Sequence, residues 1–207
     1  MYPAKHQKEI VIVFARAPTP GTCKTRLIPR YGARGAARIH RALVRRTLET
    51  ACAAGMAVEL WCAPDTRHGY FLECRRRHGV RLKRQHAGDL GRRMGLALAH
   101  ALQRCDAAII VGTDCAVLEV ADLHDARAVL HAHDHVIQPA EDGGYVLIGA
   151  RRTDPGALRG IAWSSGRELA QTRARLARRG RSCVLLPARW DIDHPGDVRR
   201  ARRAGLM

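Results

Sequence analysis

The chain has 207 residues, of which 46% are hydrophobic, so it can bury a sizeable core and global disorder is excluded. No apolar run approaches the roughly 20 residues that a membrane span needs, and the first residues lack the apolar segment of a signal peptide, so we expect a cytoplasmic protein with no membrane span. The formal net charge of +17 could indicate a nucleic-acid partner, but the basic residues are spread along the chain without a basic-aromatic run. Anionic small molecules are therefore the expected partners, rather than nucleic acid.

Strand and helix patterns alternate from the start of the chain. A continuous apolar, β-branched run at Glu9–Ala15 is typical of a strand buried on both faces of a parallel sheet. A Pro/Gly loop (Ala17–Cys23) follows, and then apolar residues at helical spacing predict a helix from about Arg34 to Ala54. Further strands are expected at 58–62, 80–84, 107–111, 135–139, 145–149 and 182–186, and further helices at 69–78, 90–103, 122–131, 166–179 and 195–204.

This rhythm predicts an α/β fold of three α/β/α layers around an open, mostly parallel sheet. The sequence contains no internal repeat and no low-complexity linker, so we expect one domain over residues 1–207. In open α/β sheets the ligand lies beyond the carboxyl ends of the strands. That rule nominates the loops after residues 15, 112 and 139 before any motif is considered.

The first of these loops is basic and stiff. The segment F-A-R-A-P-T-P-G-T-C-K-T-R-L (14–27) places Arg16, Lys24 and Arg26 beside the backbone amides of a loop with two prolines and a glycine, which suits phosphate binding. The Gly–Lys adjacency and the upstream glycine of a P-loop are missing, so a P-loop NTPase is excluded. The alternative is a solvated loop whose charges simply remain in water.

Acidic residues follow two further apolar segments. In I-I-V-G-T-D-C (109–115) Asp114 stands at a strand tip, where it could bind Mg²⁺ or Mn²⁺ or else begin the next helix. In W-D-I-D-H-P-G-D (190–197) Asp191 and Asp193 alternate along an extended stretch and so share a face. One of them could join Asp114 on a metal, although Pro195 also gives a structural reason for an acidic helix cap.

Two glycine-containing segments could lie close to a ligand. Q-P-A-E-D-G-G-Y-V-L-I-G (138–149) can present backbone and a carboxylate to a ligand, or it can be a β-hairpin turn. H-A-G-D-L-G-R-R-M (86–94) opens a predicted helix, whose N-terminus favours an anion.

Two other patterns look like metal sites but do not predict them. The seven cysteines are odd in number and form no C-x-x-C pair, which argues against a disulfide framework and a structural zinc site. The alternating histidines of H-A-H-D-H (131–135) fall between a predicted helix and a predicted strand. We expect them to form a solvated turn.

Taken together, these segments resemble the bacterial DUF2064 family, also described as transferase 1 associated with radical SAM and selenium-domain proteins. That family is related to nucleotide-diphospho-sugar transferases of the GT-A fold and to small nucleotidyltransferases such as molybdenum-cofactor and phospholactate guanylyltransferases. The resemblance runs from about Ile10 to Val198. Two departures are Arg16, where a lysine is usual, and Ala116, where a proline is usual. The matching residues are Pro18, Pro20, Gly21, Lys24, Thr25, Arg26, Leu27, Gly88, Asp89, Leu90, Gly91, Arg93, Met94, Gly112, Asp114, Cys115, Asp142, Gly143, Gly144, Tyr145, Trp163, Asp191, Asp193, Pro195 and Asp197.

The resemblance implies a GT-A-like fold, a bound Mg²⁺ or Mn²⁺ and a role for each motif. The nucleotide-binding residues would be Ala15, Arg16, Pro20, Gly21, Lys24, Arg26, Gly88 and Asp89. The metal ligands would be Asp114, Asp193 and Asp191. The residues facing the acceptor or the transferred group would be Asp142, Gly143, Gly144, Tyr145 and Trp163, and the catalytic residues would be Lys24, Asp114 and Asp142.

Two reactions fit such a site. With a nucleotide-sugar donor, the acceptor attacks the sugar carbon and the nucleoside diphosphate leaves; with a nucleoside triphosphate, a phosphate on the acceptor attacks the α-phosphorus and pyrophosphate leaves. We expect the first, a glycosyltransferase-like reaction, with nucleotidyl transfer as the alternative. A non-catalytic basic module that binds RNA is the third hypothesis, and the sequence identifies neither the base, the acceptor nor the oligomeric state.

Overall fold

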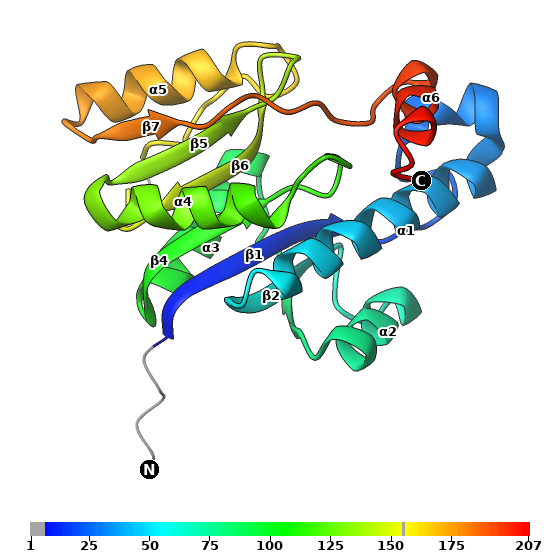
Figure 1. Ribbon diagram of the computed structural model, residues 1–207, viewed down its shortest axis with the longest axis horizontal. Helices are drawn as coiled ribbons and strands as arrows, with labels where there is room; N and C mark the ends of the chain where they lie inside the picture. The colour runs from blue at the N-terminus through cyan, green and yellow to red at the C-terminus, as the bar shows by residue number, and fades with distance from the viewer. Residues whose placement is uncertain (1–6, 155) are drawn as a thin grey trace.

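A twisted sheet of seven strands forms the centre of the computed structural model, which describes residues 7–154 and 156–207 (Figure 1). The first six residues, which contributed to the expectation about a signal peptide, lie outside the described part. The strand order is β3-β2-β1-β4-β6-β5-β7. The strands are β1 (Gln7–Arg16), β2 (Ala57–Ala63), β3 (Arg81–Arg84), β4 (Cys105–Val111), β5 (His135–Pro139), β6 (Tyr145–Ala150) and β7 (Cys183–Leu185).

The sheet is mostly parallel, as the sequence predicts. Strand β6 alone among the seven described strands runs against its two neighbours, β4 and β5, and the other paired strands are parallel. The helices are α1 (Ile28–Ala53), α2 (Gly69–His78), α3 (Leu90–Leu102), α4 (Val120–Ala132), α5 (Glu168–Arg178) and α6 (Pro195–Arg203), with a short 3-10 helix, η1 (Thr25–Leu27).

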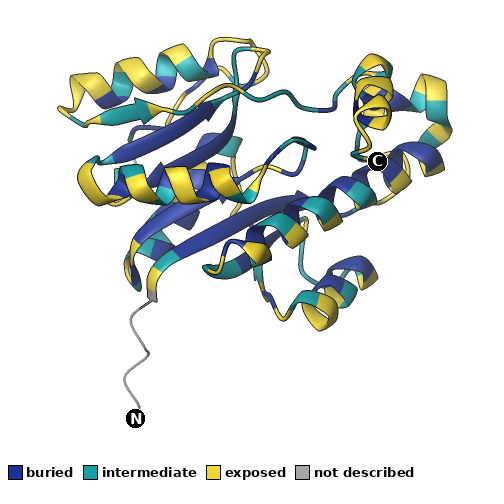
Figure 2. Ribbon diagram, in the orientation of Figure 1, coloured by how far each residue is buried: buried dark blue, intermediate teal, exposed yellow. Residues whose placement is uncertain are grey.

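Helices cover both faces of the sheet, so the predicted three layers are confirmed. Side chains of α1, α2 and α4 pack on one face, and side chains of α3 and α5 pack on the other. Strand β1 contributes to both cores because its side chains alternate: Val11 and Val13 point to the first face, Ile10 and Ile12 to the second. The inner strands are accordingly buried along most of their length, the edge strands β3 and β7 are partly exposed, and the helices expose one side (Figure 2).

Helix α1 begins earlier than the predicted start at about Arg34. It begins at Ile28 with Pro29 in its first turn, and Gly32 then interrupts the helical backbone with φ 67° and ψ 165°. Proline fits the first turn because its missing N–H needs no partner there. The regular helix therefore starts after Gly32, close to the predicted position, and the other element ends agree with the prediction to within two residues.

A third apolar cluster joins the end of the chain to the beginning of α1. Ile192, Val198 and Ala201 pack with Leu27 and Leu43, and α6 lies beside the N-terminal end of α1 in Figure 1. This contact fixes the segment that carries Asp191 and Asp193. The assignment of residues 1–207 to one domain stays a prediction.

One prediction about the histidines is wrong. His135 does not lie in a solvated turn: it is the first residue of β5 and is only 3% exposed, because its pairing with β6 and β7 places it inside the sheet. Separately, no helix in the described ranges is long and apolar enough to cross a membrane.

Candidate active site

The loops that the strand-end rule nominates meet at one edge of the sheet. The backbone N–H of Ile192 donates to the carbonyl of Asp114 at 2.8 Å, and the N–H of Glu141 donates to the carbonyl of Arg189 at 3.0 Å. The segment before α6 therefore runs between the loop after β4 and the loop after β5. It brings together at this edge of the sheet four carboxylates from distant parts of the sequence, those of Asp114, Asp142, Asp191 and Asp193.

Lys24 is at the centre of this region. Its ammonium group lies 2.8 Å from a carboxylate oxygen of Asp114 and 2.9 Å from one of Asp193, and it also donates to the carbonyl of Ile192. Arg26 holds the second oxygen of Asp193 at 2.8 Å. Burial lowers the pKa of Lys24, but the two carboxylates outweigh it and the net pKa is raised, so this side chain stays charged.

The backbone of Lys24 is unusual as well. Its φ of 48° lies in the left-handed region, which costs a non-glycine residue energy and is often found at functional sites. In the part of the chain that the structure describes, Ser164 (φ 60°) is the other non-glycine residue with positive φ. Both residues line the same hollow.

The grouped carboxylates affect one another. Burial, followed by the charges of Asp193, Asp142 and Asp114, raises the pKa of Asp191 to about 6. Burial alone would also raise the pKa of Asp193, but Lys24 and Arg26 lower it below its usual value. The like charges of the neighbouring carboxylates thus add to burial in disfavouring the ionised form of Asp191.

These residues fit a divalent cation in kind, but they are not arranged as its ligands. No group of three metal-binding side chains in the described ranges stands at coordinating geometry, and the Lys24 ammonium occupies the space between Asp114 and Asp193. Carboxylate oxygens are the ligands that Mg²⁺ and Mn²⁺ prefer. The set could hold such an ion once Lys24 has moved.

Next to the carboxylates is a basic hollow of about 450 Å³, lined by Arg16, Lys24, Arg26 and His40 together with Thr22 and Thr25. Sequence reasoning missed His40, which comes from α1. Its Nε2 atom lies 2.9 Å from the carbonyl oxygen of Arg16, and its Nδ1 atom is buried without a partner. Burial lowers the pKa of His40, so the ring stays neutral and supports the loop. No local pattern marked this histidine, because the contact spans 24 residues.

Gln85 is a second residue that the sequence reasoning missed. Its side-chain amide donates to the carbonyls of Ala15 (3.2 Å) and Trp61 (2.9 Å), and it accepts from Arg93 at 2.9 Å. It thereby ties the predicted nucleotide loop to the end of β2. Gln85 directly follows β3, so a full application of the strand-end rule could have found it.

Four of the predicted nucleotide-binding residues shape loops instead of lining this hollow. Pro20 and Gly21 are exposed, and Gly21 has a φ of 85° that suits glycine. Asp89 caps α3 by accepting from the N–H of Arg92 at 2.8 Å. Gly88 precedes it with φ 111°.

On the other side of the carboxylates is an acidic hollow of about 270 Å³. Its wall includes Tyr145 and Trp163, whose ring centroids are 6.1 Å apart in an edge-to-face arrangement, and the carboxylate of Asp142, which accepts from the N–H of Gly144 at 2.9 Å. A Cβ at Gly143 would lie 2.2 Å from the carbonyl oxygen of Gly166. Glycine is therefore required there for the two loops that frame this hollow to touch.

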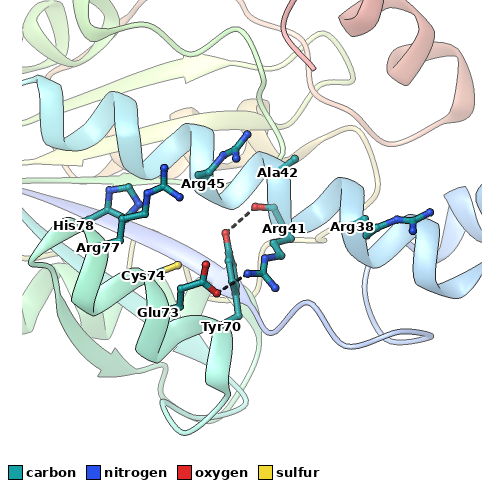
Figure 3. Close-up of a pocket in the computed structure, with 9 residues that line it drawn as sticks. All are labelled: Arg38, Arg41, Ala42, Arg45, Tyr70, Glu73, Cys74, Arg77 and His78. Carbon is teal, nitrogen blue, oxygen red and sulfur yellow. Dashed lines mark hydrogen bonds and ion pairs between the residues drawn. The ribbon is translucent and has the colours of Figure 1, made fainter.

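A further hollow lies away from the strand ends, between α1 and α2 (Figure 3). Arg38, Arg41, Arg45 and Arg77 line it, and Glu73 pairs with Arg41 at 2.5 Å. It contains none of the predicted site residues.

Comparison with known proteins supports the same family as the motifs. A family model described as "Uncharacterized protein conserved in bacteria (DUF2064)" matches residues 47–165, more than half of the chain. The chain belongs to this family. No curated protein matches it.

Solved structures share the fold of this DUF2064 member. A candidate nucleotide-diphospho-sugar transferase from Desulfovibrio desulfuricans G20 is 26% identical, with a TM-score of 0.84 over 91% of this chain and 83% of that one. The enzyme CMP:2-keto-3-deoxy-manno-octonic acid synthetase, solved with CTP, is 14% identical (TM-score 0.58; 96% and 98% covered). A Mycobacterium tuberculosis H37Rv protein solved with manganese is 20% identical (TM-score 0.56; 94% and 97% covered). The fold is thus that of nucleotide-diphospho-sugar transferases.

Proposed function

We propose that this protein is a metal-dependent transferase that binds a nucleotide sugar and passes the sugar to an acceptor. The observation that carries the proposal is the position of Lys24, which lines the basic hollow and pairs with Asp193 and with Asp114, a residue that lines both the basic and the acidic hollow. The relative at 26% identity, described as a candidate nucleotide-diphospho-sugar transferase, supports it.

In this proposal the basic hollow binds the diphosphate of the donor. Arg16 and Arg26 pair with phosphate oxygens through their planar guanidinium groups, and Lys24 contributes a point charge. Asp114, Asp191 and Asp193 would hold Mg²⁺ or Mn²⁺, which would neutralise charge on the leaving diphosphate. His40 and Gln85 act indirectly, because they fix the loop after β1 through its carbonyl groups.

The acidic hollow receives the acceptor and the transferred sugar. One oxygen of Asp142 is occupied by the N–H of Gly144, and the carboxylate can accept the proton of an attacking hydroxyl. The acceptor oxygen then forms the new bond to the sugar carbon, and the bond from that carbon to the diphosphate breaks. Tyr145 and Trp163 provide the wall against which the reacting groups lie.

Nucleotidyl transfer is the second candidate. The observation that favours it is the related fold of a synthetase solved with CTP, a nucleoside triphosphate. In that case a phosphate on the acceptor would attack the α-phosphorus, and pyrophosphate would leave.

A thermal-shift experiment tests the proposal. Nucleoside triphosphates and nucleotide sugars are added with and without Mg²⁺ or Mn²⁺ to the wild type and to Asp114→Ala. A ligand at a hundred times its Kd stabilises the folded state by about 2.7 kcal/mol, so we expect a metal-dependent rise in Tm with a nucleotide sugar that the variant loses. A larger rise with a triphosphate would favour nucleotidyl transfer. If no nucleotide raises the Tm of the wild type with either metal, the proposal is wrong.

Arg77→Ala is the matched control for that experiment. It also removes a charge, but from the hollow between α1 and α2, and it should respond to nucleotide and metal as the wild type does.

A further inference from the structure

The two hollows at the candidate site carry opposite charge. The basic hollow contains three cationic side chains, Arg16, Lys24 and Arg26, and its two acids, Asp114 and Asp193, are both paired with Lys24. The acidic hollow is lined by Asp114, Asp142, Glu168 and Asp191, and no lysine, arginine or histidine is among the described residues that line it. In a chain with a formal net charge of +17, a cavity without any basic side chain is a marked exception.

A buried carboxylate in this cavity has an oxygen without a partner. Glu168 is 6% exposed, and its Oε1 atom accepts from the N–H of Ser165 at 2.8 Å. Its Oε2 atom is buried and makes no hydrogen bond. A buried carboxylate oxygen without a partner is costly, so a ligand that donates a hydrogen bond to it would restore what burial removes.

Other groups on the same wall are suited to a ligand with both apolar and polar parts. The Nε1 atom of Trp163 is also buried without a partner. Burial raises the pKa of the Tyr145 hydroxyl, which lies beside Thr172 and Glu168, so that hydroxyl stays neutral. The rest of the lining is largely apolar and includes Phe14 and Met94.

We propose that the acceptor in the acidic hollow carries no phosphate: it presents an apolar face to the aromatic wall and a hydroxyl or amino group to Glu168. This inference rests on the proposed function, in which the acidic hollow is the acceptor side. It makes the substrate class of that side more specific. Asp114 is paired with Lys24, and Asp114 and Asp191 are proposed metal ligands, but Asp142 and Glu168 have no basic side chain beside them in this lining. A phosphorylated acceptor would place its negative charge against these two carboxylates. The structure thus favours glycosyl transfer over nucleotidyl transfer to a phosphate.

Three probes of matched shape test the inference: cyclohexylmethylamine, cyclohexylmethanol and cyclohexylmethyl phosphate. The full chain is labelled with 5-fluorotryptophan, and binding is followed by fluorine NMR at Trp163, one of three tryptophans, whose signal is assigned with Trp163→Phe. We expect the amine and the alcohol to shift this signal, with the amine binding more tightly. The phosphate should bind at least about tenfold more weakly than the alcohol, a difference of about 1.4 kcal/mol.

Variants assign the selectivity to the cavity. Glu168→Gln keeps an oxygen for the N–H of Ser165 but removes the charge, so the preference for amine over alcohol should fall severalfold. Tyr145→Phe provides a second variant in case Glu168→Gln does not fold, and the Tm of each variant shows whether it is folded. Tyr145→Phe should weaken the binding of cyclohexylmethanol. The inference is overturned if the phosphate binds as tightly as the alcohol, or if no probe shifts the Trp163 signal.

The same samples separate this inference from the proposed function. Nucleotide and metal are added to the probe-free protein, and Tm is measured. Selective probe binding without any nucleotide effect would support the cavity's preference and contradict the transferase. A metal-dependent nucleotide effect with a preference for the phosphate probe would support the transferase and contradict the inference about the acceptor.

Discussion

The pKa of Asp191 depends on its burial and on the carboxylates beside it. Burial and the charges of Asp193, Asp142 and Asp114 raise its pKa to about 6, compared with about 3.9 for an unperturbed aspartate. Because the folded-state pKa lies above the unfolded one, the contribution of Asp191 to stability is complete below about pH 4 and is lost as the pH rises through about 6.

Asp191→Asn should therefore stabilise the metal-free protein in a pH-dependent way. The gain in Tm over the wild type should be small at about pH 4.5 and larger at about pH 7.5, where the wild-type carboxylate is ionised among other carboxylates. The Tm of the variant and of the wild type is measured at each pH by thermal denaturation, monitored by circular dichroism, in buffer with a chelator. Asp106→Asn, a change outside the site, serves as the reference; equal gains for Asp191→Asn at both pH values would contradict the assignment.

The sequence predicted the acids of the site better than their partners. Asp114 and Asp142 follow apolar strands, so the strand-end rule places them at one edge of the sheet. The pairing of Lys24 with Asp193 spans 169 residues, and the contribution of Glu168 depends on how α5 packs. No local spacing contains that information, because it arises only once the loops are folded against each other.

A buried network positions the segment that carries Asp191. Arg189 makes a two-pronged contact with Asp122 of α4 at 2.8 and 3.1 Å, and Gln138 of β5 donates to the same carboxylate at 2.6 Å. Asp122 is 4% exposed. The network therefore holds the loop before Asp191 against helix α4 and strand β5.

Arg189→Met should destabilise the fold and loosen the site. Removing the cation leaves the Asp122 carboxylate buried without its ionic partner, which costs on the order of 3 kcal/mol. Urea denaturation gives the free energy of unfolding, and metal affinity in the presence of nucleotide should fall in the same variant. The exposed Arg199 of α6 offers a control, since Arg199→Ala should change stability by less than about 0.5 kcal/mol. A variant Arg189→Met as stable as the wild type would show that the network contributes little.

Helices and strands could be predicted from the sequence where burial requires a regular pattern of apolar residues. The apolar run of β1 is visible in the sequence because both of its faces are covered. The antiparallel direction of β6 was not, because Asp142 and Gly143 can form either a hairpin turn or a ligand-facing loop. In the structure they form the turn between β5 and β6, and Asp142 also lines the acidic hollow. The interruption of α1 at Gly32 was not predicted either, although glycine adopts its φ of 67° without strain.

The overall charge affects behaviour that is unrelated to the candidate site. With a formal net charge of +17 and arginines gathered between α1 and α2 (Figure 3), the molecule should attract any polyanion at low ionic strength. Non-specific binding of this kind depends strongly on salt because counterions are released.

We expect a fluorescent single-stranded oligonucleotide to bind at about 50 mM salt and to lose more than about tenfold in affinity by about 200 mM. The stabilisation by nucleotide and metal should persist over that range, because the Lys24 side chain is only 6% exposed and is less accessible to salt than the surface arginines. Fluorescence anisotropy and thermal shift, measured in the same buffers, compare the two. Retention of tight oligonucleotide binding at the higher salt, together with no effect of nucleotide, would favour the RNA-binding hypothesis.

In the proposed function, the two ion pairs of Lys24 would link the binding of metal and nucleotide. Asp114 and Asp193 can share a divalent cation only after the ammonium group has left them, and the ammonium is then a buried charge that needs another anion. A phosphate in the basic hollow is the nearest one that a ligand could supply. Each ligand thus prepares the site for the other, and by thermodynamic reciprocity the apparent Kd for metal falls by the same factor as the apparent Kd for nucleotide. On this proposal the lysine offsets part of the charge of Asp114 and Asp193 until both ligands are present, and it would prevent either ligand from binding tightly alone.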